Sequence, residues 1–311
     1  MKIILPLLSL VLCGIIMFSS KIGTDGDKDI TDAPVDIVDP SKFASDVINY
    51  QFEKPPPGAD AGKHFGDVND IVKRGELVVL SRKKDYTPIF QMKTKDGYVG
   101  EDVEFAKMLA DGLGVKLTIR MIYKDCDEIV DAIARGEGDI GISKISYTDE
   151  RSRKVLYTDP YVTSGLCMLV NRLAIKRLRV NTLRELFDNR NAVVVGHKNT
   201  SYEYYARQYC TRAKFVSEAD WDKVIIDNLR SSKFSATLRD SITVNLLLHE
   251  YPRYCLELLP INLKDVADPY AAVVNTKSTS LCVWVNKHLA INGGGQTDTS
   301  RLMKKYNGYI K

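Results

Sequence analysis

Metal-binding motifs are missing from this sequence of 311 residues, which holds four histidines and six cysteines but no C-x-x-C or H-E-x-x-H string. That absence argues against a structural zinc site and against a zinc protease. A strong excess of one charge is missing too, because the net charge of +4 is small and evenly spread, which argues against nucleic-acid binding. We therefore expect no metal, no cofactor and no nucleic-acid partner.

The N-terminal apolar run is shorter than a membrane-spanning helix usually is. It extends from Ile3 to Phe18, and Lys2 precedes it. This length is typical of the core of a signal peptide, so residues 1–20 are interpreted as a segment that exports the chain. The large residues Met17 and Phe18 stand where small residues favour cleavage. An uncleaved signal anchor is therefore the alternative.

A polar segment, residues 21–66, follows this run. It is rich in Asp, Gly and Pro, includes Pro55-Pro56-Pro57-Gly58, and shows weak apolar periodicity. This composition predicts a mostly extended tether, with one short helix near Phe43 to Tyr50. We expect a periplasmic or other extracytoplasmic location, with the chain either released or tethered to the membrane by its N-terminal segment.

From Asp67 onward, helical and strand patterns alternate. Val68, Ile71 and Val72 share a helical face that ends at Gly75, and residues 77–80 form an apolar strand that we expect to be buried on both faces. Further helices are predicted within 97–113 and over 127–135, 221–233, 242–249, 278–289 and 299–309, with strands over 115–122, 140–142, 165–170, 192–195, 234–238 and 269–274. This order predicts an α/β fold built on parallel strands.

The segment from Gly136 to Tyr161 carries the clearest chemical pattern. After the strand come Ser143, Ser146 and Arg151, which we place on a loop that opens a helix, and residues 159–161 are expected to form a second turn. Hydroxyls, a guanidinium and helix-start amides beyond a strand's carboxyl end would form an anion site. The alternative is that Arg151 is one of several basic residues on a solvated helix.

This pattern resembles the family 3 extracellular solute-binding proteins, the polar-amino-acid receptors of ABC importers. The motif stands here as S-K-I-S-Y-T-D-E-R, from Ser143 to Arg151, followed by Y-T-D-P-Y, from Tyr157 to Tyr161. Other family-like strings occur in the right order from about Asp67 to the C-terminus. One of them, G-E-D-V-E-F-A, has Glu101 where the family usually has Phe.

The resemblance implies a two-lobed periplasmic-binding-protein type 2 fold. Each lobe is a mainly parallel sheet flanked by helices, and two crossover strands form the hinge. We expect residues 67–168 and 270–311 to form lobe 1 and residues 169–269 to form lobe 2. Export would permit disulfides, and Cys210 and Cys255 fall in the same expected lobe. They are the pair to test first, although the sequence leaves the connectivity open.

A ligand site between the lobes is also implied by the resemblance. The matching positions are Tyr86, Lys144, Ser146, Arg151, Thr200, Ser201 and Asp240. Arg151 would hold the ligand carboxylate, and Asp240 would pair with its α-amino group. Thr200 and Ser201 would approach the carboxylate from a helix start in the other lobe. The open alternatives are a merely packed Tyr86, a capping role for Thr200 and Ser201, and Asp240 as the N-cap of the helix over 242–249.

The expected function is capture of a polar amino acid, or a similar small carboxylate, for an ABC permease by a monomeric protein. Basic residues such as Lys144 favour an acidic ligand if they point into the cleft. A membrane-tethered sensor or accessory module with the same fold is the main alternative. An enzyme such as a dehydratase is a further one, but no catalytic pair is evident, because Glu101 and His197 stand without a partner in the sequence.

Overall fold

Among the described residues, nine strands form one mixed sheet in the structure, which is a computed structural model. The strand order is β1-β5-β2-β6-β11-β7-β10-β8-β9. The structure describes residues 48–56, 58, 60, 65–83, 89–95, 97–292, 299–306 and 308, all within one compact unit. The predicted signal segment and most of the predicted tether lie outside these residues.

The first lobe is built on parallel strands. Its strands are β1 (Asn49–Gln51), β5 (Lys116–Tyr123), β2 (Glu76–Arg82) and β6 (Ile140–Ser146). A separate hairpin consists of β3 (Met92–Thr94) and β4 (Gly97–Val99). The helices are α1 (Val68–Arg74), α2 (Glu101–Leu113), α3 (Cys126–Arg135), α4 (Asp149–Ser152), α10 (Thr279–Ile291) and α11 (Thr299–Lys305). Leu77 and Val79 of β2 pack in one core, and Val78 and Leu80 pack in another. Because successive side chains of a strand point to opposite faces, β2 is buried on both, as its sequence predicted.

The second lobe repeats this architecture. Its parallel strands are β10 (Ala236–Asp240), β8 (Val193–His197) and β9 (Lys214–Glu218), and its helices are α5 (Arg172–Leu178), α6 (Leu183–Phe187), α7 (Ser201–Tyr209), η2 (Trp221–Ile226), α8 (Asp227–Arg230), α9 (Ser241–Glu250) and η3 (Pro252–Leu256). Here too the sheet has a core on each face, because Met168 and Leu169 belong to different clusters.

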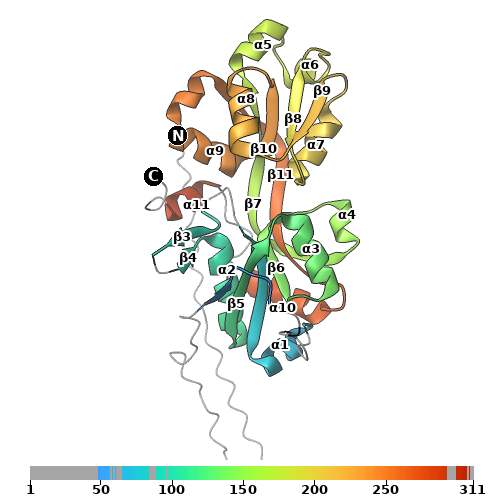
Figure 1. Cartoon of the computed structure of the whole chain (residues 1–311), viewed down its shortest axis with the longest axis vertical. Coiled ribbons are helices and arrows are strands. Elements are labelled where there is room, and N and C mark those ends of the chain that lie inside the picture. Colours follow the sequence, from blue (N-terminus) through green and yellow to red (C-terminus); the bar gives the residue numbers. More distant parts are fainter. Residues whose placement is uncertain are drawn as a thin grey trace, which may run out of the picture. The chain divides into compact units, whose positions relative to one another are not determined.

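Two long antiparallel strands, β7 (Val155–Asn171) and β11 (Leu258–Asn275), run through both lobes (Figure 1). Residues 270–274 of β11 pair with β6 of the first lobe, whereas residues 166–170 of β7 pair with β10 of the second. These strands are the two crossovers expected at the hinge. The two-lobed α/β fold is therefore confirmed.

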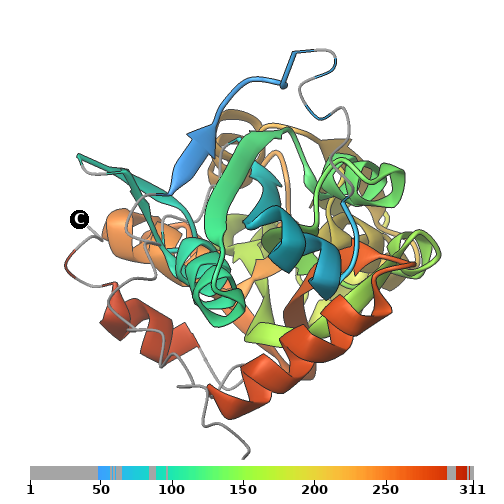
Figure 2. The same ribbon diagram turned by 90° about the horizontal axis from the view of Figure 1, so that it is seen from below.

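The N-terminal cap of α1 also fixes α10. Asp67 accepts hydrogen bonds from the amides of Val68 at 3.0 Å and Ser280 at 3.1 Å. Ser278 Oγ donates to the carbonyl oxygen of Gly66 at 3.1 Å. Figure 2 shows the result, with α10 in red lying beside α1 in blue. The predicted end of α1 is confirmed as well, because Gly75 has a φ of 74° in the left-handed region that favours glycine.

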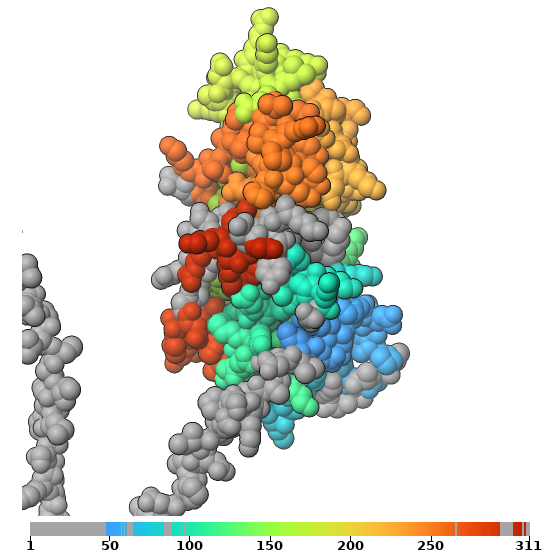
Figure 3. All heavy atoms as spheres, turned by 90° about the vertical axis from the view of Figure 1, so that its left-hand side faces the viewer, coloured from blue at the N-terminus to red at the C-terminus, as the bar shows by residue number. Residues whose placement is uncertain are grey.

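Helix α11 packs against α2 through the residue that departs from the family pattern. Lys305 Nζ lies 2.8 Å from Glu101 Oε2, and Tyr306 donates a hydrogen bond to the same oxygen at 3.1 Å. The space-filling view shows α11, in dark red, against the green surface of α2 (Figure 3). A phenylalanine at position 101 could form neither contact, so the glutamate here serves to hold α11.

Pairing with β11 makes two strands longer than the sequence predicted. Ser143 and Ser146, expected on a loop, lie on β6, and residues 159–161, expected to form a turn, continue β7. Both strands pair with β11, which is distant in sequence. Long-range pairing of this kind overrides the local turn preference of Asp159 and Pro160.

The sequence predicts a short helix near Phe43 to Tyr50, but the part of this segment that the structure describes is a strand. Residues 49–51 form β1 and pair with the edge of β5, and the Tyr50 ring packs 5.1 Å from that of Tyr98. The segment that carries β1 also contacts a buried polar residue of β5. Arg120 of β5 is buried and donates to Gln51 Oε1 at 2.8 Å and to Asp60 Oδ1 at 2.7 Å.

All cysteines in the described part of the chain carry free thiols, so the Cys210–Cys255 pair does not form. Cys210 packs with the core on one face of the second lobe's sheet. Cys255 adjoins Tyr254, which packs with the core on the other face. Membership of one lobe was therefore too coarse a criterion for proposing a pair.

Candidate functional site

A cavity of about 240 Å³ lies between the lobes. Its lining consists of Arg82, Lys124, Asp125, Cys126, Lys144, Ser146, Arg151, His197, Lys198, Asn199, Thr200, Ser201, Tyr202, Ala219 and Arg239. The carboxyl ends of β2, β6 and β8 contribute to it, which is where open α/β sheets bind ligands. Among these described residues six are basic and only Asp125 is acidic, so the cavity suits an anion.

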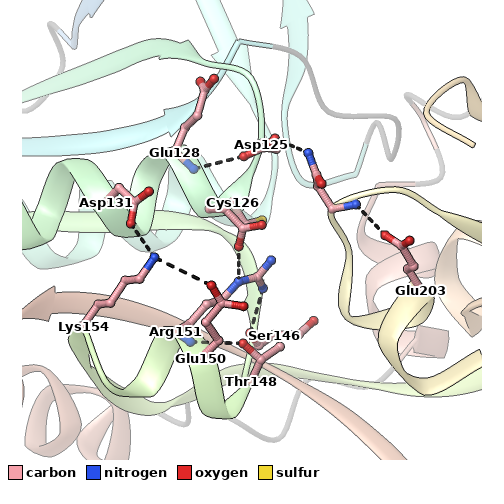
Figure 4. A network of polar contacts seen from close by, with 12 residues as sticks. Asp125, Cys126, Glu128, Asp131, Ser146, Thr148, Glu150, Arg151, Lys154 and Glu203 are labelled. Carbon is pink, nitrogen blue, oxygen red and sulfur yellow. Dashed lines mark hydrogen bonds and ion pairs between the residues drawn. The ribbon is translucent and has the colours of Figure 1, made fainter. Parts of the chain in front are cut away.

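Arg151 is a buried cation in this lining, with 5% of its surface exposed. Its Nε donates to Asp127 Oδ1 at 2.7 Å, and its Nη1 donates to the carbonyl oxygen of Ser146 at 3.0 Å (Figure 4). Burial disfavours its charge, but Cys126 and Asp127 outweigh burial and raise the pKa of Arg151 above its ordinary value. Arg151 is therefore a fixed, permanently charged group and not a solvated basic residue.

Lys144 reaches the cavity from β6 through an unusual backbone conformation. Its φ is 50°, in the left-handed region, and its amide donates to the hydroxyl of Tyr161 at 2.9 Å. The hydroxyl of Tyr161 in turn donates to Asp102 Oδ1 at 2.5 Å. The side chain is buried, with Nζ 4.9 Å from the ring centroid of Phe90. The basic group at this position faces inward.

The start of α7 closes the cavity from the second lobe. Thr200 caps the helix, because its Oγ1 accepts from the amide of Glu203 at 3.3 Å and donates to the carbonyl oxygen of His197 at 2.6 Å. Ser201 is buried and lines the cavity, and its hydroxyl makes no hydrogen bond within the described part of the chain. The first amides of a helix also lack intrahelical acceptors. Ser201 thus offers donors to a ligand, whereas the Thr200 hydroxyl is already used.

Arg239 and His197 form a second buried group, and neither was among the seven expected site residues. Arg239 Nη1 lies 2.6 Å from His197 Nδ1, and His197 Nε2 lies 3.1 Å from the carbonyl oxygen of Ala219. Burial, followed by the charge of Arg239, lowers the pKa of His197 to about 3. The imidazole is therefore neutral near pH 7, accepts from Arg239 at Nδ1 and donates from Nε2.

Aromatic rings hold the Arg239 guanidinium in place. Its central carbon lies 4.8 Å from the Trp221 ring centroid and 5.0 Å from that of Tyr202. One feature of the sequence could have indicated a site role for Arg239, namely its position at the end of a strand, directly before Asp240. Adjacent strand residues point to opposite faces, so only one of the two can face the cavity.

Asp240 is fully buried and is not part of the cavity lining. Its carboxylate accepts from the amide of Thr243 at 2.7 Å and from the hydroxyl of Thr243 at 2.8 Å, and it lies 3.5 Å from Arg239 Nε. The N-cap role considered for it is confirmed. Five of the seven expected site residues line the cavity, namely Lys144, Ser146, Arg151, Thr200 and Ser201. Tyr86 lies outside the described residues.

A buried acid on the hinge strand was missed by the sequence analysis. Asp268 of β11 is 3% exposed. Burial raises the pKa of Asp268 to about 6, and hydrogen bonding to Tyr202 and Ser146 offsets this only in part. Because both of those residues line the cavity, the Asp268 carboxylate lies next to it. Lys264 and Asp265 stand close to Asp268 in the same strand, so the sequence gives no signal that marks Asp268 as the buried acid.

Two contacts cross between the lobes beside the cavity. Asn199 Nδ2 donates to Asp125 Oδ2 at 3.1 Å, and the hydroxyls of Tyr202 and Tyr270 lie 3.1 Å apart. Asn199 has a φ of 60°, in the left-handed region that asparagine tolerates better than most residues. These contacts show the lobes closed around the cavity.

Comparison with known proteins gives one family match, to the bacterial extracellular solute-binding proteins, family 3, over residues 78–308. The cyclohexadienyl dehydratase of Pseudomonas aeruginosa is 26% identical over 185 residues, which are 60% of this chain and 66% of that protein. The L-cystine-binding protein TcyJ of Escherichia coli K12 is 29% identical over 184 residues, which are 58% of this chain and 65% of that protein. The matches thus span just under two thirds of these two relatives.

A solved structure of similar fold is that of the ancestral amino acid-binding protein AncCDT-1, described as a precursor of cyclohexadienyl dehydratase. It is 26% identical, has a TM-score of 0.59, and aligns over 78% of this chain and 99% of its own. Within the described part of this chain, every helix is too short or too polar to cross a membrane.

Proposed function

The chain belongs to the bacterial extracellular solute-binding proteins of family 3, and we propose that it captures a small carboxylate-bearing molecule in the cavity between its lobes. The ligand is a polar amino acid or a similar small carboxylate. The protein acts outside the cytoplasm as a monomer and delivers the ligand to an ABC permease. The ligand-binding residues are Lys144, Ser146, Arg151 and Ser201, with Tyr86 as a further contact. Thr200 lines the cavity and caps α7, so its role is to position Ser201 and not to donate its hydroxyl.

The observation that carries this proposal is the fixed guanidinium of Arg151. It is buried, lines the cavity and is anchored by Asp127 and by the carbonyl oxygen of Ser146. A preorganised arginine binds a carboxylate through charge-assisted hydrogen bonds, the stronger class of such bonds. The side chain needs no reordering when the ligand arrives, so little affinity is lost to entropy.

Ligand capture is coupled to closure of the lobes. Arg151 comes from the first lobe, and Ser201 comes from the start of α7 in the second. A carboxylate that contacts both bridges the cleft and stabilises the closed arrangement over the open one. The hinge consists of β7 and β11, and the closed form is the one that a permease distinguishes.

We propose a binding role and not a dehydratase role. Loss of water from a substrate needs a general acid near the leaving hydroxyl. The carboxylate of Asp125 in the lining accepts from Asn199 and caps α3, and both ring nitrogens of His197 are engaged. Asp125 and His197 are therefore committed to structural contacts. Asp268, the acid beside the cavity, is already hydrogen-bonded to Tyr202 and Ser146, so a dehydratase would have to use a carboxylate that is engaged.

The test is a thermal-shift screen of the 311-residue chain against amino acids and small carboxylates, followed by calorimetry. Ligand at a hundredfold over its dissociation constant adds about 2.7 kcal/mol of stability, which is several degrees for a protein of this size. Arg151→Lys keeps the charge but loses the fork geometry, so we expect affinity to fall at least about tenfold.

Arg153→Ala is the matched control, because Arg153 lies two residues away and is exposed. We expect it to bind like the unchanged chain. The proposal fails if no amino acid or carboxylate shifts the midpoint, or if Arg151→Lys binds as tightly as Arg153→Ala.

A further inference from the structure

The carboxylate of Asp268 is buried beside the cavity and keeps a capacity to accept hydrogen bonds. Its Oδ2 atom makes none within the described part of the chain. Burial raises the pKa of Asp268 to about 6, although hydrogen bonds from Tyr202 and Ser146 act in the opposite direction. An ionised carboxylate offers about four acceptor positions, so two such bonds leave room for a further donor.

The strand register places Asp268 at the cavity independently of any titration. Asp268 lies two residues before Tyr270 on β11, so the two side chains point to the same face of that strand. Tyr270 pairs directly with Ser146 of β6, and its hydroxyl lies 3.1 Å from that of Tyr202. Ser146 and Tyr202 both line the cavity, and the carboxylate therefore lies against two residues of its wall.

Arg151 and Asp268 hold opposite charges on two sides of Ser146. Arg151 Nη1 donates to the carbonyl oxygen of Ser146 at 3.0 Å (Figure 4), whereas Asp268 takes the hydroxyl of the same residue. One residue thus separates a fixed guanidinium from a buried carboxylate. An α-amino acid carries a carboxylate and an ammonium group on one carbon atom, so its two charges have a spacing that suits this pair.

The other groups near Asp268 leave its charge incompletely compensated. The ionisable side chains that act on it, or on the rings against it, are Lys144 of β6, Asp240 of β10, Tyr202 and Tyr205 of α7, and Tyr270 of its own strand. The repulsion from Asp240 exceeds the attraction from Lys144, whose Nζ lies 4.9 Å from the Phe90 ring centroid. A buried charge of this kind is costly without a partner.

Lobe motion gives a ligand access to this carboxylate. Asp268 belongs to the hinge strand β11, whereas Tyr202, which covers it in the closed arrangement, belongs to α7 of the second lobe. Opening of the lobes moves Tyr202 away from Asp268, and closing then buries a bound cation together with the carboxylate. The pair therefore forms where water is excluded, which strengthens the attraction between the two charges.

We propose that Asp268, and not Asp240, holds the ammonium group of the ligand, so that the ligand is an α-amino acid bound as a zwitterion. Arg151 and Ser201 hold the carboxylate of this molecule. The inference rests on the proposed function, because it narrows the class of ligand for the same cavity. A carboxylate without the ammonium group leaves Asp268 uncompensated in the closed cleft and binds more weakly.

The experiment is calorimetry of the 311-residue chain at pH 7.5 with four matched pairs of probes. The pairs are L-glutamate and glutarate, L-glutamine and glutaramate, L-norleucine and hexanoate, and L-lysine and 6-aminohexanoate. The members of a pair differ only by the α-ammonium group, and the pairs cover acidic, amide, apolar and basic side chains. In each pair that binds, we expect the amino acid to bind at least about tenfold more tightly than its analogue.

Asp268→Asn tests whether Asp268 is the source of this preference. Asparagine has nearly the same shape and still accepts hydrogen bonds, but it carries no charge. We expect the preference for the amino acid to fall at least about fivefold, with little change in the affinity of the analogue. Asp159→Asn is the matched control, because Asp159 is an exposed aspartate on β7, the other crossover strand. Ligand-free unfolding midpoints show whether each variant is folded.

Proton release from the unchanged chain provides a measurement that needs no variant. An ammonium group beside Asp268 favours the ionised carboxylate and lowers its pKa. Because the pKa of Asp268 is about 6 without ligand, binding of the amino acid should release protons near pH 6 and far fewer near pH 8. The affinity should rise over the same interval. The analogue should release none. Calorimetry in two buffers with different ionisation enthalpies counts the protons.

The outcomes separate the two proposals. An analogue that binds as tightly as its amino acid overturns the inference and leaves the capture function standing. A preference that a folded Asp268→Asn variant retains, or one without proton release near pH 6, overturns the inference as well. Binding of none of the probes also overturns it, and a negative screen of amino acids and carboxylates in addition overturns the proposed function.

Discussion

Asn199 of the second lobe donates a hydrogen bond to Asp125 of the first lobe at 3.1 Å, and this bond closes one side of the ligand cavity. Each residue also stabilises the backbone next to it. Asp125 caps α3 by accepting from the amide of Glu128 at 3.0 Å, and Asn199 takes a left-handed turn before α7.

Asn199→Gly is expected to weaken ligand binding without unfolding the protein. Glycine adopts the left-handed conformation freely, so the substitution removes the cross-lobe bond and keeps the turn. One hydrogen bond contributes about 0.5–1.5 kcal/mol, which corresponds to a loss of affinity of about two- to tenfold. Calorimetry with the best-binding probe measures this loss.

The control for that prediction is Asn191→Ala, at an exposed asparagine of the same lobe outside the cavity. Small-angle scattering of the ligand-free proteins should show a larger radius of gyration for Asn199→Gly than for the control. Identical affinities and identical scattering would show that the Asn199–Asp125 bond does not contribute to closure.

His197→Asn is expected to remove part of the acid sensitivity of folding. The pKa of His197 is about 3 in the folded protein, whereas an unperturbed histidine has a pKa of about 6.5. Below about pH 6.5 the unfolded chain binds a proton that the folded chain refuses, so this residue makes stability fall as the pH falls. Asparagine keeps an acceptor near Arg239 and does not titrate in this range.

Urea unfolding between pH 4.5 and 7.5 measures the effect. The two proteins should lose stability at different rates below pH 6.5, with the steeper loss in the unchanged chain. At pH 7.5 the variant is expected to be less stable by about 1 kcal/mol, because the bond to the carbonyl oxygen of Ala219 is lost. Parallel curves over the whole range would contradict the account of His197.

Glu101→Ala is expected to loosen α11. Glu101 accepts from Tyr306 and pairs with Lys305, and alanine removes both contacts, whereas Glu104 keeps its own contacts with the same two residues. The ammonium group is partly exposed, so the ion pair itself is screened, and most of the effect comes from the lost hydrogen bond. We expect a loss of about 1 kcal/mol in the free energy of unfolding and faster amide exchange in α11. Glu150→Ala, at an exposed acid with a 4.0 Å contact to Lys154, is the control. Equal exchange in both variants would rule out this role of Glu101.

The sequence predicted the elements whose signals are local. Helix α1 has an acidic cap and a terminal glycine, and β2 is an unbroken apolar run, so both appear near their expected bounds. The lengths of β6 and β7 depend on pairing with β11, which lies far away in the sequence. No local pattern carries that information.

The same distinction separates the site residues. Arg151 and Ser201 belong to motifs with recognisable neighbours, and the structure places both in the cavity. Asp240 could be a helix cap or a ligand partner, because both roles call for an acid at the same place. Only the packing shows that its carboxylate is buried and that the Arg239 side chain lines the cavity. Asp268 has no local signal at all.

Trp221 provides the most direct measurement of ligand capture between the lobes. Its ring contacts Arg239 at 4.8 Å and His197 at 6.0 Å, and Trp284→Phe leaves it as the sole tryptophan of the chain. Titration of this variant with the amino acid or carboxylate that gives the largest thermal shift should give a saturable fluorescence change, shifted to at least about tenfold higher concentration by Arg151→Lys. A saturable change that Arg151→Lys leaves in place, or no change with that ligand, would contradict capture at this cavity.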